Sequence, residues 1–303
     1  MKNTSNILAP IVLFAYNRPW HIHQTLESLK KNELANQSDL IIFSDAARKS
    51  TDTAPVQEVR RYIKTVKGFN SVNIIERTNN FGLANSIIDG VSQVINEYGN
   101  VIVLEDDLVT SPYFLKYMND GLRYYENAED VISIHGYIYP MNDVLPETFF
   151  LRGADCWGWA TWKRGWALFE RDGKKLLNEL QSRHAEYEFD FNGSYPYTRM
   201  LRNQISGKNN SWAIRWHASA FLRNKFTLYP GQSLVQNIGH DGSGTHCGST
   251  DALTIEQLAM APVQLCDIAI QEHPDLKRLM ILYFRSLRRR LIWSRIVRIL
   301  KMG

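Results

Sequence analysis

The stretch Val101-Ile102-Val103-Leu104-Glu105-Asp106-Asp107 decides the fold of this chain. Its first four residues are β-branched or leucine, which is typical of a short strand buried on both faces of a sheet. Three carboxylates follow directly, and burying them without a positive partner is unfavourable. Oxygen ligands at the carboxyl end of a parallel strand suit Mg²⁺ or Mn²⁺ that holds a pyrophosphate. The alternative is a solvated acidic loop after a core strand.

Strands and helices alternate along the first third of the chain, which predicts an α/β fold with a mostly parallel sheet and helices on both faces. Ligands of such sheets bind outside the carboxyl ends of the strands. The polar groups at four strand ends are therefore expected to meet at one edge. The predicted strands are 11–16, 40–44, 72–76 and 101–104, the predicted helices are 21–31, 56–66 and 83–98, and the polar groups are Asn17-Arg18, Asp45, 77–80 and 105–107.

The turn at 79–82 enters the third predicted helix, where free backbone amides and the positive end of the helix dipole favour a phosphate. Neither a Gly-x-Gly-x-x-Gly nor a Walker pattern is present, so the sequence indicates neither a dinucleotide fold nor a P-loop kinase.

Further along, the sequence predicts helices at 111–125, 164–171, 175–183, 197–206 and 212–223, a strand at 131–135 and a loop at 184–196. Trp157 and Trp159 flank a glycine and predict a platform for a sugar acceptor, with core packing as the alternative. The segment 239–248 holds four glycines and His246, and it predicts a lid that folds over a ligand. A plain surface loop is the alternative there.

Composition bounds the class of protein. With 303 residues, 44% hydrophobic and 22% charged, the chain is expected to be globular, in one large domain or two. Three cysteines, at 156, 247 and 266, give neither a disulfide framework nor metal-type spacing. No apolar stretch of membrane-spanning length occurs, so we expect a reducing cytoplasmic compartment and no membrane span.

The basic charge is concentrated at the end of the chain. Residues 276–301 contain nine Lys or Arg and no acid, which leaves 26 basic against 31 acidic residues elsewhere. The pattern predicts a basic amphipathic helical tail, 276–303, that lies on an anionic membrane surface. A helix packed on the body and a nucleic-acid patch are the alternatives, and no nucleic-acid partner is expected.

These motifs, in this order, resemble the GT-A fold nucleotide-sugar glycosyltransferases of the bacterial family-2-like type, whose sheet is Rossmann-like. They also resemble the Golgi N-acetylglucosaminyltransferase that acts on high-mannose N-glycans. The matching pieces are 10–18, Phe43-Ser44-Asp45, 81–84, the Leu-Glu-Asp-Asp-Leu segment at 104–108, Gly158-Trp159 and the late Gly–His loop. The resemblance implies a glycosyltransferase domain at 1–275, with a nucleotide-binding half at about 1–108 and an acceptor half with the lid at 109–275.

The resemblance also implies roles for the donor-site residues. Arg18 and Asp45 would hold the uridine or another base, and Asn80 would lie beside them. Asp106 would face the ribose or a phosphate. His246 would lie on the loop that covers the donor.

The metal and acceptor sites follow from the same resemblance. Asp107 would be the main ligand of Mn²⁺ or Mg²⁺, with Glu105 as a second ligand or as a structural residue. Trp157 and Trp159 would receive the acceptor.

The expected activity is that of a metal-dependent, inverting glycosyltransferase of the hexosyltransferase type. It would move a sugar from a nucleotide-diphosphate donor, a UDP-sugar, to a saccharide or lipid-linked saccharide in bacterial surface polysaccharide or glycoconjugate synthesis. A carboxylate must take the proton of the acceptor hydroxyl. The Golgi enzyme places this acid in a Trp-rich helix, but residues 211–216 here contain none, so the candidates are Asp155 and Asp241. Asp241 is favoured because its loop can close over the donor.

Two other functions remain possible on the sequence. A sugar nucleotidyltransferase needs a Gly-rich phosphate loop after the first strand, where this chain has Tyr16-Asn17-Arg18-Pro19. A catalytically inactive GT-A-like adaptor would dock on membranes by its tail, but the intact acidic triplet argues against it. The expected location is cytoplasmic and peripheral, on the inner face of the cell membrane.

Overall fold

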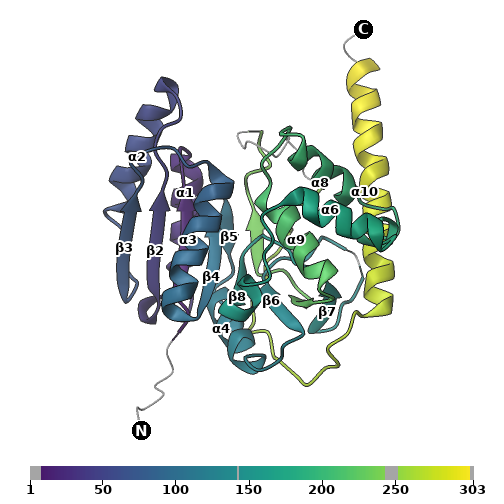
Figure 1. Cartoon of the computed structure of the whole chain (residues 1–303). Helices are drawn as coiled ribbons and strands as arrows, with labels where there is room; N and C mark the ends of the chain where they lie inside the picture. Colours follow the sequence, from purple (N-terminus) through teal and green to yellow (C-terminus); the bar gives the residue numbers. More distant parts are fainter. Residues whose placement is uncertain (1–7, 142, 243–251, 301–303) are drawn as a thin grey trace.

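The computed structural model describes residues 8–141, 143–242 and 252–300, with side chains in the last range up to Arg290. One eight-stranded sheet runs through the molecule in the order β3-β2-β1-β4-β8-β6-β9-β7 (Figure 1). Its strands, in that order, are Ser71–Glu76, Asp39–Ser44, Ile11–Ala15, Asn100–Glu105, Trp159–Trp162, Val131–His135, Phe226–Pro230 and Thr148–Arg152.

The first four of these strands are parallel, as the sequence predicts. β1 pairs with β2 on one side and β4 on the other, and β2 pairs with β3. The connecting helices are α1 (Pro19–Leu29), α2 (Thr53–Ile63) and α3 (Leu83–Tyr98). Each predicted strand and helix of this half is present, with its ends within three residues of the prediction.

Alternate residues of the buried strands face two different helix layers. Leu13 and Ile42 pack in one core cluster with residues of α1 and α2, while Phe14 and Phe43 pack in another with residues of α3. Gly90 of α3 allows the closest approach, because an added Cβ would lie 2.8 Å from the Phe14 ring. The prediction of helices on both faces of the sheet is therefore confirmed.

The second half of the sheet is mixed. β8 is antiparallel to both β4 and β6, β9 is parallel to β6, and β7 is antiparallel to β9. Its helices are α4 (Phe114–Tyr124), α5 (Lys163–Trp166), α6 (Gly173–Ser182), α7 (Glu186–Phe189), α8 (Tyr197–Ile205) and α9 (Trp212–Leu222). The helix predicted at 164–171 is only the short α5, and the loop predicted at 184–196 contains α7.

A small second sheet brings the late part of the chain back to the acidic triplet. β5 (Leu108–Thr110) and β10 (Val235–Asn237) pair antiparallel, with Leu108 opposite Asn237. The backbone N–H of Ile238 donates to the carbonyl of Asp107 at 2.8 Å. Residues 238–242 therefore start directly beside the end of β4.

The chain ends in one long helix, α10 (Pro274–Leu300). Leu276, Met280, Phe284 and Leu287 are buried in a core cluster with Phe149 of β7. The first part of this helix, up to Leu287, therefore packs on the body of the protein. For this part, the alternative to a membrane-bound tail holds. Among the described residues, no helix is both long enough and apolar enough to cross a bilayer.

Candidate active site

Arg18 and the acidic triplet meet where β1 and β4 end, at the edge predicted from the sequence. The Arg18 guanidinium pairs with a carboxylate oxygen of Asp106 and lies 2.9 Å from Oδ2 of Asp107. Both aspartates are buried, with 4% and 8% of their surface exposed. The positive partner that the triplet requires is therefore supplied by the first strand–helix turn of the chain itself.

The electrostatics of this pairing follow from burial and charge. Burial acts to lower the pKa of Arg18, but the two carboxylates outweigh it and the pKa is raised. Burial raises the pKa of Asp106 in spite of the opposing effect of Arg18. The single positive charge of Arg18 faces two carboxyl groups and cannot balance both when they are ionised, so the cluster is attractive to a further cation.

Gly239 closes the other side of the cluster. A Cβ at this position would lie 2.1 Å from Oδ2 of Asp107 and 3.0 Å from the Arg18 guanidinium. The Gly239 N–H donates to the Asn237 side-chain oxygen at 2.8 Å, which holds the turn in place. Only glycine fits between this turn and the carboxylate, so the backbone itself forms a wall of the site.

The carboxylates of this cluster would hold a divalent cation only together with oxygen atoms from a bound phosphate and from water. In the described part of the chain, no group of three or more His, Cys, Asp or Glu side chains is arranged to hold a metal. Mg²⁺ at phosphate sites is commonly held by one or two carboxylates, with the remaining ligands from phosphate and water. Asp107 and Asp106 match that pattern and would hold the metal. Their carboxylate oxygens would then contact both the metal and the Arg18 guanidinium.

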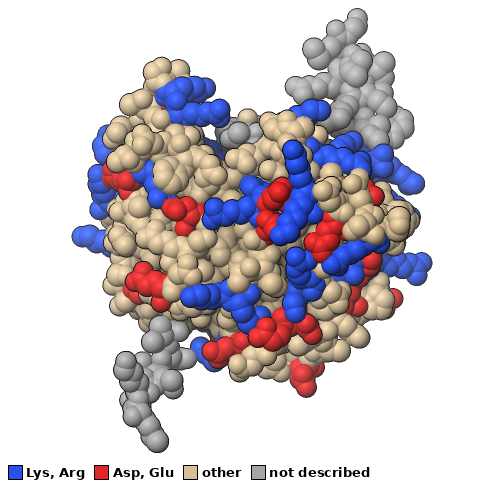
Figure 2. Space-filling model, in the orientation of Figure 1, with Lys and Arg blue, Asp and Glu red and all other residues tan. Residues whose placement is uncertain are grey.

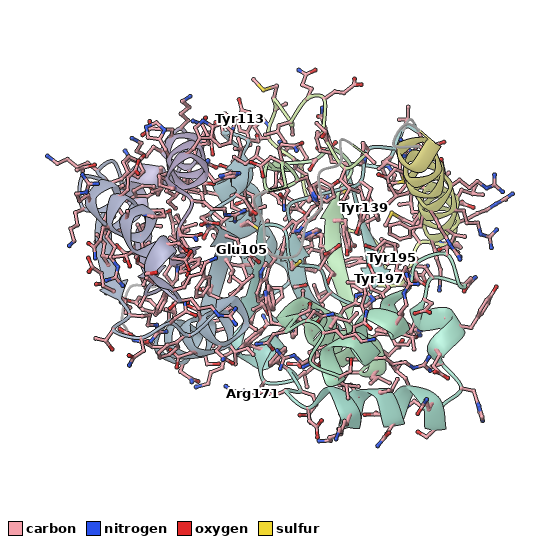
Figure 3. The ribbon with its side chains drawn as sticks, turned by 90° about the horizontal axis from the view of Figure 1, so that it is seen from above. Glu105, Tyr113, Tyr139, Arg171, Tyr195 and Tyr197 are labelled. Carbon is pink, nitrogen blue, oxygen red and sulfur yellow. The ribbon has the colours of Figure 1, made fainter. Side chains whose placement is uncertain are left out.

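Glu105 faces a different neighbour. Its carboxyl accepts a hydrogen bond from Trp212 of α9, and burial raises its pKa to about 8, with further contributions from Asp107 and Asp106. It lies in the middle of the molecule in Figure 3, between the two halves of the sheet. Of the two roles considered for Glu105, this environment favours the structural one over that of metal ligand.

Asp45 and Asn80 are brought together, at the turn before α3. Asp45 accepts hydrogen bonds from the backbone N–H groups of Ala46, Phe81 and Gly82, each at 2.9 Å, and from the Asn80 side chain at 3.1 Å. An ionised carboxylate has about four acceptor sites, and all four are occupied. Asp45 therefore stabilises the turn. A nucleotide base would contact the residues of this turn and not the Asp45 carboxylate itself.

The surface beside this turn is aromatic and polar. The Phe81 ring is partly exposed and lies under the guanidinium of Arg77, at 4.3 Å. The Tyr16 hydroxyl donates to Asp52 at 2.7 Å, and Asn17 donates to the same carboxylate at 3.2 Å. Asp52 was not among the residues predicted from the sequence, because its position before α2 indicates only a helix cap.

The two tryptophans predicted for the acceptor have different environments. Trp159 has 1% of its surface exposed and packs among Trp166, Trp212 and Trp216, with ring centroids 5.5–5.7 Å away. A sugar cannot stack on it in this structure, so the assignment of Trp159 to the acceptor is wrong and the core alternative holds. Trp157 precedes the strand, is partly buried, and its ring contacts His240 at 5.2 Å.

The two candidate bases lie on different sides. Oδ2 of Asp241 is 3.1 Å from Nε2 of His21 on α1, and 46% of its side chain is exposed. Asp155 accepts from the N–H of Cys156 at 2.9 Å. Burial, and after it the charge of Asp155, raise the pKa values of Tyr139 and Tyr197. His246 lies outside the described residues.

The tyrosines around Asp155 form a cluster that sequence reasoning missed. Tyr195 and Tyr197 have ring centroids 4.6 Å apart, and Tyr139 lies near both in Figure 3, beside α10. His217 of α9 lies against Tyr197 at 4.4 Å and bonds the Ala154 carbonyl at 2.8 Å. The sequence shows two pairs of tyrosines, each two residues apart, at 137 and 139 and at 195 and 197. No pattern near either pair indicates that the two pairs meet in the fold.

A family comparison agrees with this geometry. The model of the family Glycosyl transferase family 2 matches residues 11–149. No curated protein matches the chain. Among solved structures, the mannosyltransferase PcManGT from Pyrobaculum calidifontis in complex with GDP-Man and Mn²⁺ is 13% identical, with a TM-score of 0.34 over 45% of this chain and 38% of that one. TarS 1-349 of S. aureus is 16% identical, with a TM-score of 0.35 over 54% of this chain and 48% of that one.

The chain spans less than half of each of these two proteins. The family match covers β1 to β6, and with them Arg18, Asp45 and the acidic triplet. Residues 11–149, slightly less than half of the chain, are therefore similar to the family Glycosyl transferase family 2, and this similarity includes the strand edge that carries the candidate site.

Proposed function

We propose that this chain is a metal-dependent, inverting glycosyltransferase that moves a sugar from a nucleotide-diphosphate donor to a saccharide or lipid-linked saccharide. The observation that carries the proposal is the buried cluster of Arg18, Asp106 and Asp107, closed by the backbone at Gly239. It offers carboxylates to a divalent cation and a guanidinium to phosphate oxygens at the same strand edge. Surface polysaccharide or glycoconjugate synthesis in a bacterium is the proposed setting.

The donor diphosphate is expected to bind at this cluster. Mn²⁺ or Mg²⁺, held by Asp107 with Asp106, would supply positive charge to the leaving nucleoside diphosphate. Arg18 has donors beyond those that contact the aspartates and can pair with a phosphate oxygen. The turn held by Asp45 and Asn80, with the exposed edge of Phe81, would receive the base. The likeness of segment 104–108 to the Golgi N-acetylglucosaminyltransferase favours a UDP-sugar.

Asp155 is the catalytic base that we propose, in place of Asp241. What supports it is its position among tyrosines on the half of the sheet that also carries Trp157, where hydroxyl groups and ring faces suit a saccharide. Asp241 instead lies beside His21 on the nucleotide side. Asp155 would take the proton of the acceptor hydroxyl as this oxygen attacks the anomeric carbon.

Nucleotide binding followed by thermal unfolding tests the proposal. A nucleoside diphosphate should stabilise the wild-type protein when Mn²⁺ is present and much less without it. Asp107→Asn should lose the metal-dependent stabilisation, whereas Asp155→Asn should keep it and lose transfer of sugar. The exposed Asp143→Asn is the matched control for loss of one carboxylate.

The same measurement separates the two other functions. A sugar nucleotidyltransferase would be stabilised by a nucleoside triphosphate with a sugar phosphate and would release pyrophosphate. An inactive adaptor would not respond to any nucleotide. Either result would replace the proposal.

We further propose that the enzyme attaches to the cytoplasmic face of the cell membrane through the basic end of α10, where a lipid-linked acceptor would be present. The charge of this segment supports the proposal, with nine Lys or Arg and no acid between residues 276 and 301.

A further inference from the structure

Helix α10 has a part fixed to the body and a part that projects from it. Its buried residues Leu276, Met280, Phe284 and Leu287 follow a helical stripe that faces the core. Arg288, Arg289 and Arg290 after them are exposed. In Figure 1 the helix continues past the body toward the C-terminus. The anchoring of the first part therefore holds the projecting part in a fixed direction.

A groove lies where the helix leaves the body. It has a volume of about 310 Å³ and is lined by Arg285, Arg288 and Arg289 of α10 and by the loop 192–194. The three arginines are spaced i, i+3 and i+4, so they share one face of the helix. Figure 2 shows Lys and Arg side chains gathered near the projecting end of the helix.

The arginines of the groove have no acidic partner among the residues that the structure describes. Within the part of the chain that the structure describes, none of the three makes an ion pair or a hydrogen bond through its side chain. The neighbouring Arg290 differs, because its guanidinium lies 5.9 Å from the Tyr283 ring. Three guanidinium groups around one groove repel one another, so an anion in the groove would relieve an unfavourable arrangement.

The facing loop adds polar groups of the right kind. Phe191, Asn192 and Gly193 all have positive φ, at 47°, 53° and 73°, which bends the loop tightly across the groove. The Asn192 side chain is partly exposed and has no hydrogen-bond partner among the described residues. Its amide can therefore donate to an anion together with the arginines.

We propose that this groove binds the phosphate groups of anionic phospholipids and fixes the enzyme on the membrane surface. The inference rests on the membrane attachment proposed above and names the residues that make the contact. Guanidinium forks match phosphate oxygens in a bidentate manner. Seven of the ten residues at 291–300 are apolar and none is acidic, a composition that suits the lipid interface beyond the phosphates.

This attachment differs from that of a helix lying flat in a leaflet. The apolar stripe at 276–287 is already covered by the body, so it cannot insert into lipid without unfolding from the core. Binding should therefore depend on the three arginines as a localised site, and not on the helix as a whole.

Sedimentation of the full chain with vesicles tests the proposal. Phosphatidylcholine vesicles are compared with vesicles that also contain phosphatidylglycerol. The double variant Arg288→Glu with Arg289→Glu should bind the anionic vesicles at least roughly 30-fold less tightly than the wild type, since each basic residue near such a surface contributes about fivefold. The matched control, Arg61→Glu with Lys67→Glu, makes the same charge change at exposed positions near α2 and should bind nearly as the wild type does.

A third variant, Arg288→Lys with Arg289→Lys, keeps the charge but removes the bidentate forks, and it should fall between the wild type and the Glu variant. Thermal unfolding and Mn²⁺-dependent nucleotide binding of each variant show that the fold is retained, since the groove lies apart from the donor site.

The outcomes are distinguishable. If the wild type binds no anionic vesicle, both the attachment and the groove are wrong. If the wild type binds but the Glu variant binds equally, or if the control loses as much as the groove variant, the attachment stands and the groove is wrong. Displacement of the vesicles by a short DNA duplex that binds more tightly would also overturn the proposal.

Discussion

Glu105→Gln should stabilise the protein, and the gain should grow with pH. Glu105 is held at the end of β4, where burial and the neighbouring Asp107 and Asp106 raise its pKa to about 8 from an ordinary value of 4.5. Glutamine has nearly the same shape and keeps an oxygen to accept the hydrogen bond from Trp212. The substitution therefore removes the ionisation and leaves the packing.

The sign and size follow from proton linkage. Between pH 4.5 and about 8 the unfolded chain releases the Glu105 proton while the folded chain keeps it, so stability falls as pH rises through this window. Each pH unit in the window costs about 1.36 kcal/mol, which gives an upper limit of about 5 kcal/mol across it. Because the three carboxylates are coupled, we expect the gain of Glu105→Gln to be about 2–5 kcal/mol near pH 8 and close to zero below pH 4.5.

Urea unfolding of wild type and variant at about pH 5 and about pH 8 measures this difference. The exposed Glu33→Gln is the control for loss of one negative charge, and its effect should be below about 0.5 kcal/mol at both pH values. A stability gain of Glu105→Gln that is equal at both pH values would refute the reasoning, because it would mean that the folded state does not hold the proton.

Other substitutions test the rest of the site. Gly239→Ala should cost about 1–3 kcal/mol, because the added methyl group overlaps the carboxylate beside it, and it should weaken Mn²⁺-dependent nucleotide binding; unchanged binding in a nucleotide titration would show that the turn does not border the site. Trp159→Ala should cost about 3–5 kcal/mol in thermal unfolding. Trp157→Ala should cost much less and act mainly on the KM for the acceptor, so equal losses of stability would contradict their different burial. Asp45→Ala should speed amide hydrogen exchange at residues 81 and 82 by roughly tenfold or more, since a hydrogen bond to a charged group contributes about 1.5–3 kcal/mol; slow exchange in the variant would show that the turn holds itself.

The edge of the sheet that carries the candidate site was predictable from the sequence for a local reason. Buried parallel strands require short apolar runs, and the first half carries four of them between amphipathic helices. The polar residues that follow such strands meet at one edge. The convergence of Arg18 with Asp106 and Asp107, and of Asp45 with Asn80, therefore follows from the order of strands and helices along the chain.

Other features depended on contacts between distant segments. β5 and β10 have three residues each, too few for a pattern, and only their pairing brings Gly239 against Asp107. Trp157 and Trp159 look alike in sequence, but the burial of Trp159 is decided by Trp212 and Trp216 of α9, some fifty residues later in the chain. Glu105 and Trp212 are also far apart in the sequence, so their hydrogen bond could not be predicted from it. This hydrogen bond favours a structural role for Glu105 over that of a metal ligand.

The tail shows the same division. The sequence by itself determined that the end of the chain is a basic helix with apolar residues between its Lys and Arg residues, because charge and periodicity are local properties. Which apolar residues face the body and which remain for another surface was decided by the tertiary structure. Leu276, Met280, Phe284 and Leu287 are covered because β7 and the loop before α8 offer them a complementary apolar face.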